Sequence, residues 1–209
     1  MPLQNRVNPK GELKAVGSRG QFLGNRGIIH NDIKEIISTH KIKGWVTCRL
    51  EFKGRKRELM AKGRYTELFF LDEATAFSAG HRPCAECRRE RYNEFKEKWM
   101  EANNHLLPID SKKISDIDKI IHQDRIDKKQ KVVFEETMDA LPDGTMIQIN
   151  SLEYIIWNGK IFKWSFEGYE KTHIDITSDP VAVLTPKSYV KMFKKGFIPT
   201  VHNSLLQGG

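Results

Sequence analysis

The sequence predicts an α+β protein. We expect an N-terminal β-hairpin with helices around a Cys-x2-Cys turn, then a small antiparallel sheet or partial barrel with flanking helices. Apolar residues recur at helical spacing in 88–102 and 114–126. Strand-forming residues dominate 45–52 and 64–71, and an Asn-Gly pair at 158–159 separates two further strand patterns, which favours a tight hairpin.

The N-terminal half begins with a glycine-rich arm over 1–27, which we expect to be irregular. Apolar residues at positions 28, 29, 33, 36 and 37 then predict a helix over 28–37. A turn at 53–55 is expected to join the strands 45–52 and 64–71 into the hairpin, because glycine between two strand patterns favours a tight turn.

A short helix is predicted to begin at Asp72, whose carboxylate can accept hydrogen bonds from the amides of the first turn. It is predicted to end at Gly80, because glycine readily adopts the left-handed backbone found after many helices. The Cys-x2-Cys turn follows, and a second helix is predicted over 88–102 with three aromatic residues on one face.

A polar segment at 103–113, interrupted by Pro108, is the predicted linker between two modules. We therefore divide the chain into a module with the cysteine turn and the irregular arm, residues 1–107, and a β-rich module with helices, residues 108–209. The second module begins with a helix over 114–126, whose isoleucines lie along one stripe.

The remainder of the second module is predicted to be mainly β. Its strands are placed at 131–134, 145–149, 152–157, 160–166 and 181–184. A last helix is predicted before Gly196, with Thr185 as its cap and Pro186 at its first position, where the amide hydrogen that proline lacks would have no helical partner.

Composition restricts the class of protein. The chain has 209 residues, 39% of them hydrophobic, so it is not composed like a disordered protein. Its apolar runs are far shorter than the roughly 20 residues of a membrane-spanning helix. The N-terminus lacks a signal-peptide pattern and three cysteines do not suit a disulfide framework, so we expect a cytoplasmic protein. The net charge of +8 favours a polyanionic partner such as nucleic acid.

Cys84 and Cys87 have the spacing with which one tight turn can present two thiolates to a metal ion. A helix that begins directly after Cys87 would favour the thiolate form through its positive dipole end. A tetrahedral zinc site needs two more ligands. The candidates are Cys48 and His30, with His81 as a further one, and no spacing in the sequence chooses among them.

Two other interpretations of the cysteines stay open. A redox dithiol has the same spacing, although such pairs usually follow a strand in a βαβ unit. The cysteines could also be buried packing residues, and Cys48 in particular lies within a predicted strand, where free cysteine is commonly a small core residue.

Segment 69–88 resembles the zinc-binding N-terminal domain of the Ada family of DNA-repair proteins. It carries an aromatic pair, an alanine-rich stretch and then Gly-His-Arg-Pro-Cys-Ala-Glu-Cys-Arg at 80–88, in the order and spacing of that family. The resemblance implies a zinc ion next to a DNA-binding surface. In that family four cysteines hold the zinc, and one of them accepts a methyl group from a DNA phosphotriester.

The chain departs from the Ada pattern at the first cysteine pair. That pair should fall near 54–57, where this chain has Gly-Arg-Lys-Arg, and the one cysteine upstream of the Cys-x2-Cys turn is Cys48. This departure weakens the case for methyl-acceptor chemistry. It still allows the zinc site that the resemblance implies, with other residues as the remaining ligands.

Basic residues flank the cysteine turn, and residues 49–64 alone carry a net charge of +5. We predict that they form one face that binds phosphates without reading bases. The predicted nucleic-acid-binding residues are Lys53, Arg55, Lys56, Arg57, Arg82, Arg88 and Arg89. The alternative is that these are solvated charges, several of them paired with glutamates at helical spacing.

These features together predict a zinc-stabilised nucleic-acid-binding protein that contacts duplex DNA through a basic face. One alternative is a metal-dependent nuclease, in which His30 with Asp32, or His122 with Asp124, would bind a hydrolytic metal. The other is a structural-zinc module that binds an acidic protein. The sequence names no catalytic residue, and the aromatic residues in 157–169 are expected to belong to the core.

Overall fold

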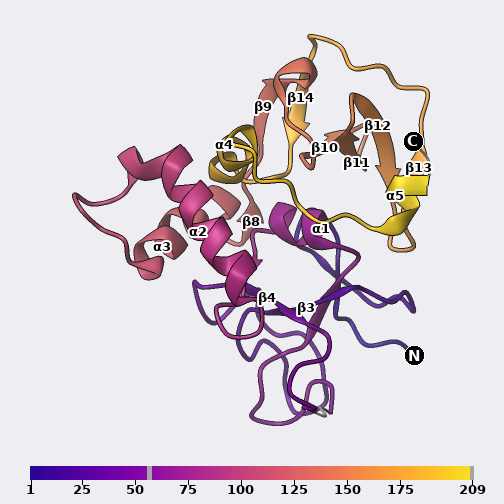
Figure 1. Ribbon diagram of the computed structural model, residues 1–209. Coiled ribbons are helices and arrows are strands. Elements are labelled where there is room, and N and C mark those ends of the chain that lie inside the picture. Colours follow the sequence, from indigo (N-terminus) through magenta and orange to yellow (C-terminus); the bar gives the residue numbers. More distant parts are fainter. Residues whose placement is uncertain (56–57, 208–209) are drawn as a thin grey trace.

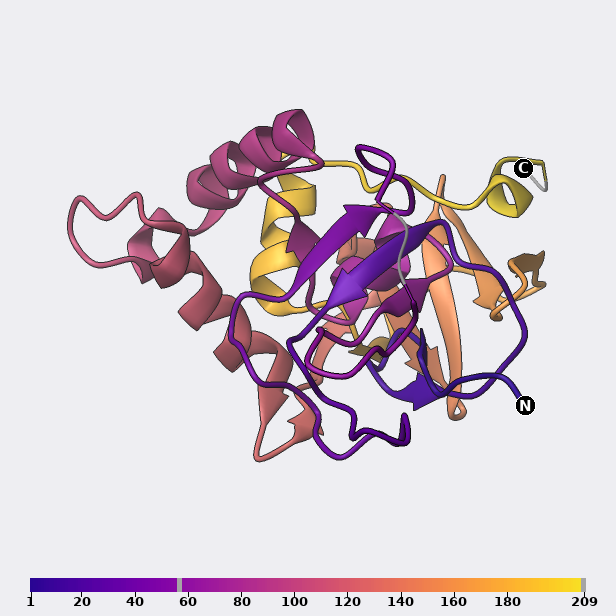
Figure 2. The ribbon, with the colours of Figure 1, turned by 90° about the horizontal axis from the view of Figure 1, so that it is seen from below.

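The computed structural model describes residues 1–55 and 58–207. It contains two six-stranded sheets, with the short helix α1 (Glu73–Ser78) between them. Figures 1 and 2 show α2 (Arg89–Asn103) and α3 (Ile114–Arg125) together on one flank of the molecule. The mixture of helices and sheets confirms the predicted α+β class.

The N-terminal sheet is mixed, with the strand order β2-β1-β5-β3-β4-β6. Its strands are β1 (Arg6–Val7), β2 (Leu13–Lys14), β3 (Phe22–Asn25), β4 (Val46–Arg49), β5 (Leu68–Phe70) and β6 (Arg82–Pro83). The central strand β3 pairs antiparallel with β4 and β5, whereas β4 pairs parallel with β6.

The predicted hairpin between β4 and β5 is wrong, because β3 lies between these two strands and Leu23 is opposite Cys48. Strand β3 comes from the arm that the glycines predicted to be irregular. One of these glycines is required by packing, since a Cβ atom at Gly24 would lie 2.3 Å from the Phe70 ring. Glycine therefore permits close approach of a ring here rather than marking a loop.

The predicted helix over 28–37 is also wrong. This segment forms turns and one isolated β-bridge between His30 and Ile36. The Asn31 side chain accepts hydrogen bonds from the main-chain amides two and four residues later, and Lys34 has a left-handed φ of 65°. The asparagine thus offers the backbone a local alternative to the helix, which the apolar spacing does not reveal.

Helix α1 forms as predicted. The Asp72 carboxylate accepts the Thr75 amide hydrogen at 2.8 Å, and Gly80 adopts a left-handed φ of 84° after the helix. All six residues of α1 are buried, and the helix contacts strands of both sheets. It therefore forms the packed layer that holds the two sheets together.

Helices α2 and α3 confirm the predicted helical ranges, and α4 (Lys187–Lys194) and α5 (Asn203–Gln207) follow near the C-terminus. The first three of these pack around Phe77 of α1, which is 1% exposed. Four aromatic rings have their centroids within 6.1 Å of the Phe77 centroid, those of Phe95, Tyr189, Phe193 and Phe197. Helices from both halves of the chain thus share one aromatic core.

The C-terminal sheet is antiparallel throughout, in the order β13-β12-β11-β10-β14-β9. Its strands are β9 (Phe134–Thr137), β10 (Met146–Ile149), β11 (Leu152–Trp157), β12 (Lys160–Trp164), β13 (Tyr169–Lys171) and β14 (Pro180–Val183). The Asn-Gly hairpin is confirmed, with left-handed φ values at both turn residues. Most aromatic residues of 157–169 are buried in the core, as expected.

Two details of the C-terminal half differ from the prediction. The range 131–134 is divided between β8 (Gln130–Lys131), which pairs with β7 (Ile126–Asp127), and β9 of the large sheet. Thr185 does not cap α4, because its hydroxyl accepts the Met146 amide hydrogen at 2.9 Å and Pro186 occupies the cap position. The Thr185 side chain therefore bonds the C-terminal sheet rather than the first turn of the helix.

The two predicted modules pack against each other. One core cluster places Leu71 and Ala74 among residues of the C-terminal sheet. The two hydrophobic core clusters around α1 contain residues from both sides of residue 108. The division there into two folding units stays a prediction. Within the described parts of the chain, the helices are all too short or too polar to cross a membrane.

Replacing Phe77 by alanine should lower the free energy of unfolding by about 3–5 kcal/mol, because it removes the ring around which the aromatic core packs. Denaturant unfolding followed by circular dichroism measures this loss. The control is Ile109→Ala, since Ile109 is 94% exposed and its truncation should change stability by less than about 0.5 kcal/mol. A loss below about 1 kcal/mol for Phe77→Ala would contradict the described core.

Candidate metal centre and its basic surroundings

The three cysteines of the chain meet at one place. Cys48 lies on β4, Cys84 directly follows β6, and Cys87 precedes α2. The parallel pairing of β4 with β6 brings the two segments together, and the Cys84 amide donates to the Thr47 carbonyl at 2.9 Å. The three sulfur atoms lie within 4.8 Å of one another. Of the predicted metal ligands, the structure thus assembles three.

Main-chain amides of the turn donate hydrogen bonds that favour the thiolate form of Cys84. The Glu86 amide points at the Cys84 sulfur, at 3.4 Å. The hydrogen bond with Cys48 lowers the pKa of Cys84 to about 5, and amides of the turn contribute, against the opposing effect of burial. The same bond raises the pKa of Cys48, and burial raises that of Cys87. One thiolate is therefore favoured at Cys84, with protons held on its two neighbours.

The cluster has the dimensions of a metal site. Four thiolates at about 2.3 Å from a tetrahedral zinc ion would lie about 3.8 Å apart, which is within the observed sulfur separation. Among the described residues, this is the one group of three or more cysteine, histidine or carboxylate side chains close enough to share an ion. The three cysteines can hold a metal ion and leave a fourth position for a ligand from elsewhere.

The two candidate histidine ligands form hydrogen bonds away from the cysteine cluster. The Nδ1 atom of His30 lies 2.6 Å from the Thr66 hydroxyl, and His30 does not join the cysteine cluster. His81 is fully buried, and its Nε2 accepts a hydrogen bond from Arg26 at 3.2 Å. Burial, with the nearby positive charges, lowers the pKa of His81 well below its ordinary value. Both histidines are buried and form hydrogen bonds within the N-terminal half.

Two of the predicted phosphate-binding arginines are buried instead. Arg82 forms a bidentate ion pair with Asp118, at 2.6 and 2.8 Å. Arg88 is 8% exposed and pairs with Glu73 at 2.5 Å. Neither is on an exposed face as predicted, because carboxylates inside the protein pair with both guanidiniums.

The other predicted basic residues differ in availability. Lys53 and Arg89 are exposed, and Arg55 is exposed but paired with Glu86 at 2.6 Å. Lys56 and Arg57 lie outside the described residues. The structure adds Arg49, which is exposed and lies on β4 next to Cys48.

A groove of about 420 Å³ meets the cysteine cluster at Cys87. It is lined by Phe22, Arg49, Glu86, Cys87, Arg88, Arg89, Glu90 and Arg91. Arg49 and Arg91 belong to the basic segments that flank the cysteine turn, although the predicted binding set does not include them. The structure shows that β4 and the first turn of α2 line one groove. Four of the eight lining side chains are arginine, so the groove is basic where it meets the metal site.

The two residue pairs of the nuclease alternative are not assembled. Asp32 forms an ion pair with Lys62, and His30 bonds Thr66. Asp124 accepts the Ser188 amide hydrogen, whereas the His122 ring packs against His40 and Trp45. Neither pair belongs to a group that could hold a metal ion among the described residues.

Comparisons with protein-family models, with curated proteins and with solved structures find no match to this chain.

Removing any one of the three cysteines should weaken metal binding at least tenfold, because each supplies one of three clustered sulfurs. Titration with Co²⁺, whose thiolate complexes absorb strongly in the near ultraviolet, measures this for Cys48→Ala, Cys84→Ala and Cys87→Ala. His30→Ala is the control and should bind Co²⁺ like the unaltered protein. A strong loss in His30→Ala, or none in Cys48→Ala, would contradict the assigned cluster.

Glu73 beneath the groove should matter for acid stability. Burial alone would raise its pKa, but hydrogen bonds and charge from Arg91 and Arg88 hold the pKa below its ordinary value. The ionised Glu73 carboxylate thus stabilises the folded state fully above about pH 4.5, the pKa of a glutamate in the unfolded chain. This stabilisation is lost as the pH falls through the lower pKa of Glu73 in the folded protein. Glu73→Gln should cost about 3–5 kcal/mol at pH 7, because it leaves two arginines without their buried partner.

Urea unfolding of Glu73→Gln between pH 3 and pH 7 tests this. Its stability should depend less on pH than that of the unaltered protein. Glu170→Gln, at an exposed carboxylate on β13, is the control and should leave the profile nearly unchanged. Equal pH profiles for Glu73→Gln and the unaltered protein would be inconsistent with the described pairing.

Proposed function

We propose that the protein is a zinc-stabilised nucleic-acid-binding protein, and that duplex DNA binds in the basic groove beside the three cysteines. The observation that carries this proposal is the shared position of Cys87 in the metal cluster and in the wall of an arginine-lined groove. A metal ion bound by the three cysteines would fix the Cys84–Cys87 turn, and with it one part of the groove lining.

Zinc is the metal that this donor set favours. Thiolate ligands select soft or borderline metals, and zinc commonly binds three or four cysteines in a tetrahedral arrangement. Strand β4 and the turn after β6 are joined by few main-chain hydrogen bonds, so a metal bound by cysteines from both would stabilise this edge of the sheet. The resemblance of segment 69–88 to the Ada zinc domain agrees with this assignment.

The groove is suited to phosphate rather than to base edges. Arg49 on β4 and Arg89 on α2 are exposed and line the groove, where long cationic side chains can follow a phosphate backbone. Arg88 and Arg91 are anchored to Glu73 below them and keep the floor positively charged. A net charge of +8 adds long-range attraction to any polyanion.

The double variant Arg49→Ala/Arg89→Ala should bind duplex DNA more weakly, and by a similar factor for unrelated sequences, because phosphate contacts carry no sequence information. The negative slope of log K against log salt should decrease in magnitude by about 1.8, for two lost contacts. Fluorescence anisotropy at several salt concentrations measures both quantities.

The matched control is Lys160→Ala/Lys171→Ala, which removes two exposed charges from the C-terminal sheet and should leave the slope nearly unchanged. DNA affinity that is equal in both double variants would refute binding in this groove. Cleavage of the DNA in the presence of a divalent metal would instead favour the nuclease alternative.

A further inference from the structure

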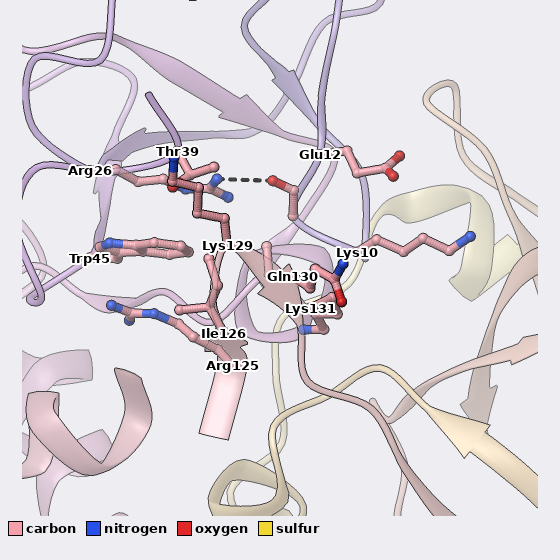
Figure 3. A pocket seen from close by; sticks show the side chains of 12 residues that line it. Lys10, Glu12, Arg26, Thr39, Trp45, Arg125, Ile126, Lys129, Gln130 and Lys131 are labelled. Carbon is pink, nitrogen blue, oxygen red and sulfur yellow. Dashed lines mark hydrogen bonds between the residues drawn. The ribbon is translucent and has the colours of Figure 1, made fainter. Parts of the chain in front are cut away.

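A second polar site lies at the opposite end of β4 from Cys48. Segments that are distant in sequence enclose a pocket of about 360 Å³ there (Figure 3). They are the turn after β1, the connection between β3 and β4, the end of α1, and the chain from the end of α3 through the β7–β8 hairpin. The charged residues that line it are five cations and one carboxylate: Lys10, Arg26, Arg125, Lys129, Lys131 and Glu12.

Trp45 holds two of these cations in place. Its ring lies between the guanidiniums of Arg26 and Arg125, whose central carbons are 4.2 and 3.7 Å from the ring centroid (Figure 3). The indole nitrogen donates to the Ile42 carbonyl at 2.9 Å, which fixes the ring. Since both faces of the ring are covered, the pocket offers positive charge rather than an aromatic surface for stacking.

Three of these cations lack counter-ions: Arg26 and Arg125, which are buried, and Lys131, which is half-buried. Arg26, Arg125 and Lys131 donate hydrogen bonds to neutral acceptors: the carbonyls of Gly11, Gly80, Lys43 and Ser78 and the rings of His81 and His122. Among the described residues, no carboxylate lies within ion-pair distance of these three cations. Inside a protein this is unusual, because buried charges are normally paired.

Two nitrogen atoms in this group have no hydrogen-bond partner at all. Arg26 is 3% exposed and its Nη2 is unpartnered, and Arg125 is 2% exposed with an unpartnered Nε. Burial lowers the pKa of both arginines to about 9 and that of Lys131 to about 7, where the charges of the two arginines contribute. The fold therefore keeps donors and positive charge together without the anion that would neutralise them.

The carboxylate in the lining does not fill this role. Glu12 accepts hydrogen bonds from Asn8 and Lys14, both at 3.0 Å, and its side chain is 52% exposed. Lys10 is engaged with Glu153 at 3.4 Å. Figure 3 shows the side chains of Glu12 and Lys10 directed away from the stack around Trp45. Arg26 and Arg125, and Lys131 when it is protonated, thus line the pocket without a carboxylate that pairs with them.

We propose that this pocket binds a phosphate monoester, with Arg26, Arg125 and Lys131 around the phosphate and Lys129 at the mouth. A phosphate monoester carries nearly two negative charges at neutral pH and three acceptor oxygens, which match several convergent cations better than a single carboxylate does. The volume of about 360 Å³ leaves room for part of the group that the phosphate is attached to.

The bound phosphate would belong either to a small metabolite or to the phosphorylated end of a nucleic-acid strand. Both present the same chemistry to the pocket. The site shares no residue with the cysteine cluster or with the groove beside it, so this inference does not rest on the proposed function.

Isothermal titration calorimetry in phosphate-free buffer at constant ionic strength tests the proposal. The probes are inorganic phosphate, adenosine 5′-monophosphate, and one oligonucleotide with either a 5′-phosphate or a 5′-hydroxyl group. We expect saturable binding near one site per chain for at least one phosphorylated probe. Lys131→Gln should weaken it at least tenfold, and Lys129→Gln, at the exposed mouth, by a smaller factor.

Lys160→Gln is the matched control and should bind every probe like the unaltered protein, because Lys160 lies in the distant β11–β12 hairpin. Lys131→Gln should remain folded without ligand, since it removes a half-buried positive charge that has no counter-ion. Its thermal midpoint, measured without phosphate, checks this, and Lys129→Gln tests the pocket independently of any effect on folding.

The probes also separate the two sources of phosphate. Tighter binding of the 5′-phosphorylated than of the 5′-hydroxyl oligonucleotide, with the difference abolished in Lys131→Gln, supports a strand end as the ligand. Binding of adenosine 5′-monophosphate or inorganic phosphate, without that difference, supports a small metabolite. Absence of saturable binding for all phosphorylated probes, or equal affinities in Lys131→Gln and Lys160→Gln, would overturn the proposal.

Discussion

Two adjacent buried carboxylates at the start of α1 are the constraint on which the rest of the structure depends. Asp72 and Glu73 are both 0% exposed, so each must find its partners inside the protein. Asp72 bonds Thr75, the Tyr169 hydroxyl and the His202 amide, and Glu73 bonds Arg88, Arg91 and the Thr200 amide. These partners lie on α1, α2, the C-terminal sheet and the C-terminal segment. One dipeptide thus ties together both halves of the chain.

The same arrangement positions both candidate sites. Glu73 holds Arg88, and Arg88 also donates to the Thr47 hydroxyl at 2.7 Å, so the start of α2 is fixed against β4 next to Cys87. Strand β4 then carries Cys48 at one end and leads back to Trp45 at the other. A thiolate cluster and a cationic pocket therefore lie on one short strand, one suited to a metal ion and the other to an anion.

Several local signals in the sequence predicted local structure correctly, whereas the apolar spacing over 28–37 and the expected Thr185 cap did not. The Asp72 cap, the helical stripes of α2 and α3 and the Asn-Gly hairpin are all present, because neighbours in the chain decide them. Pairing between distant segments was not predictable. Strand β3 lay hidden among glycines, and the burial of Arg82 and Arg88 depends on Asp118 and Glu73, which no local pattern connects to them. The cationic pocket was missed for the same reason.

The central claim is that Cys48, Cys84 and Cys87 form a zinc site that stabilises a nucleic-acid-binding surface. Elemental mass spectrometry of protein purified without added metal or chelator tests it most directly. The account predicts about one zinc ion per chain, lost in Cys84→Ala, because structural zinc survives purification. A metal-free chain that keeps its thermal midpoint in chelator, and in Cys84→Ala, would contradict it and would leave the three cysteines as ordinary packing residues.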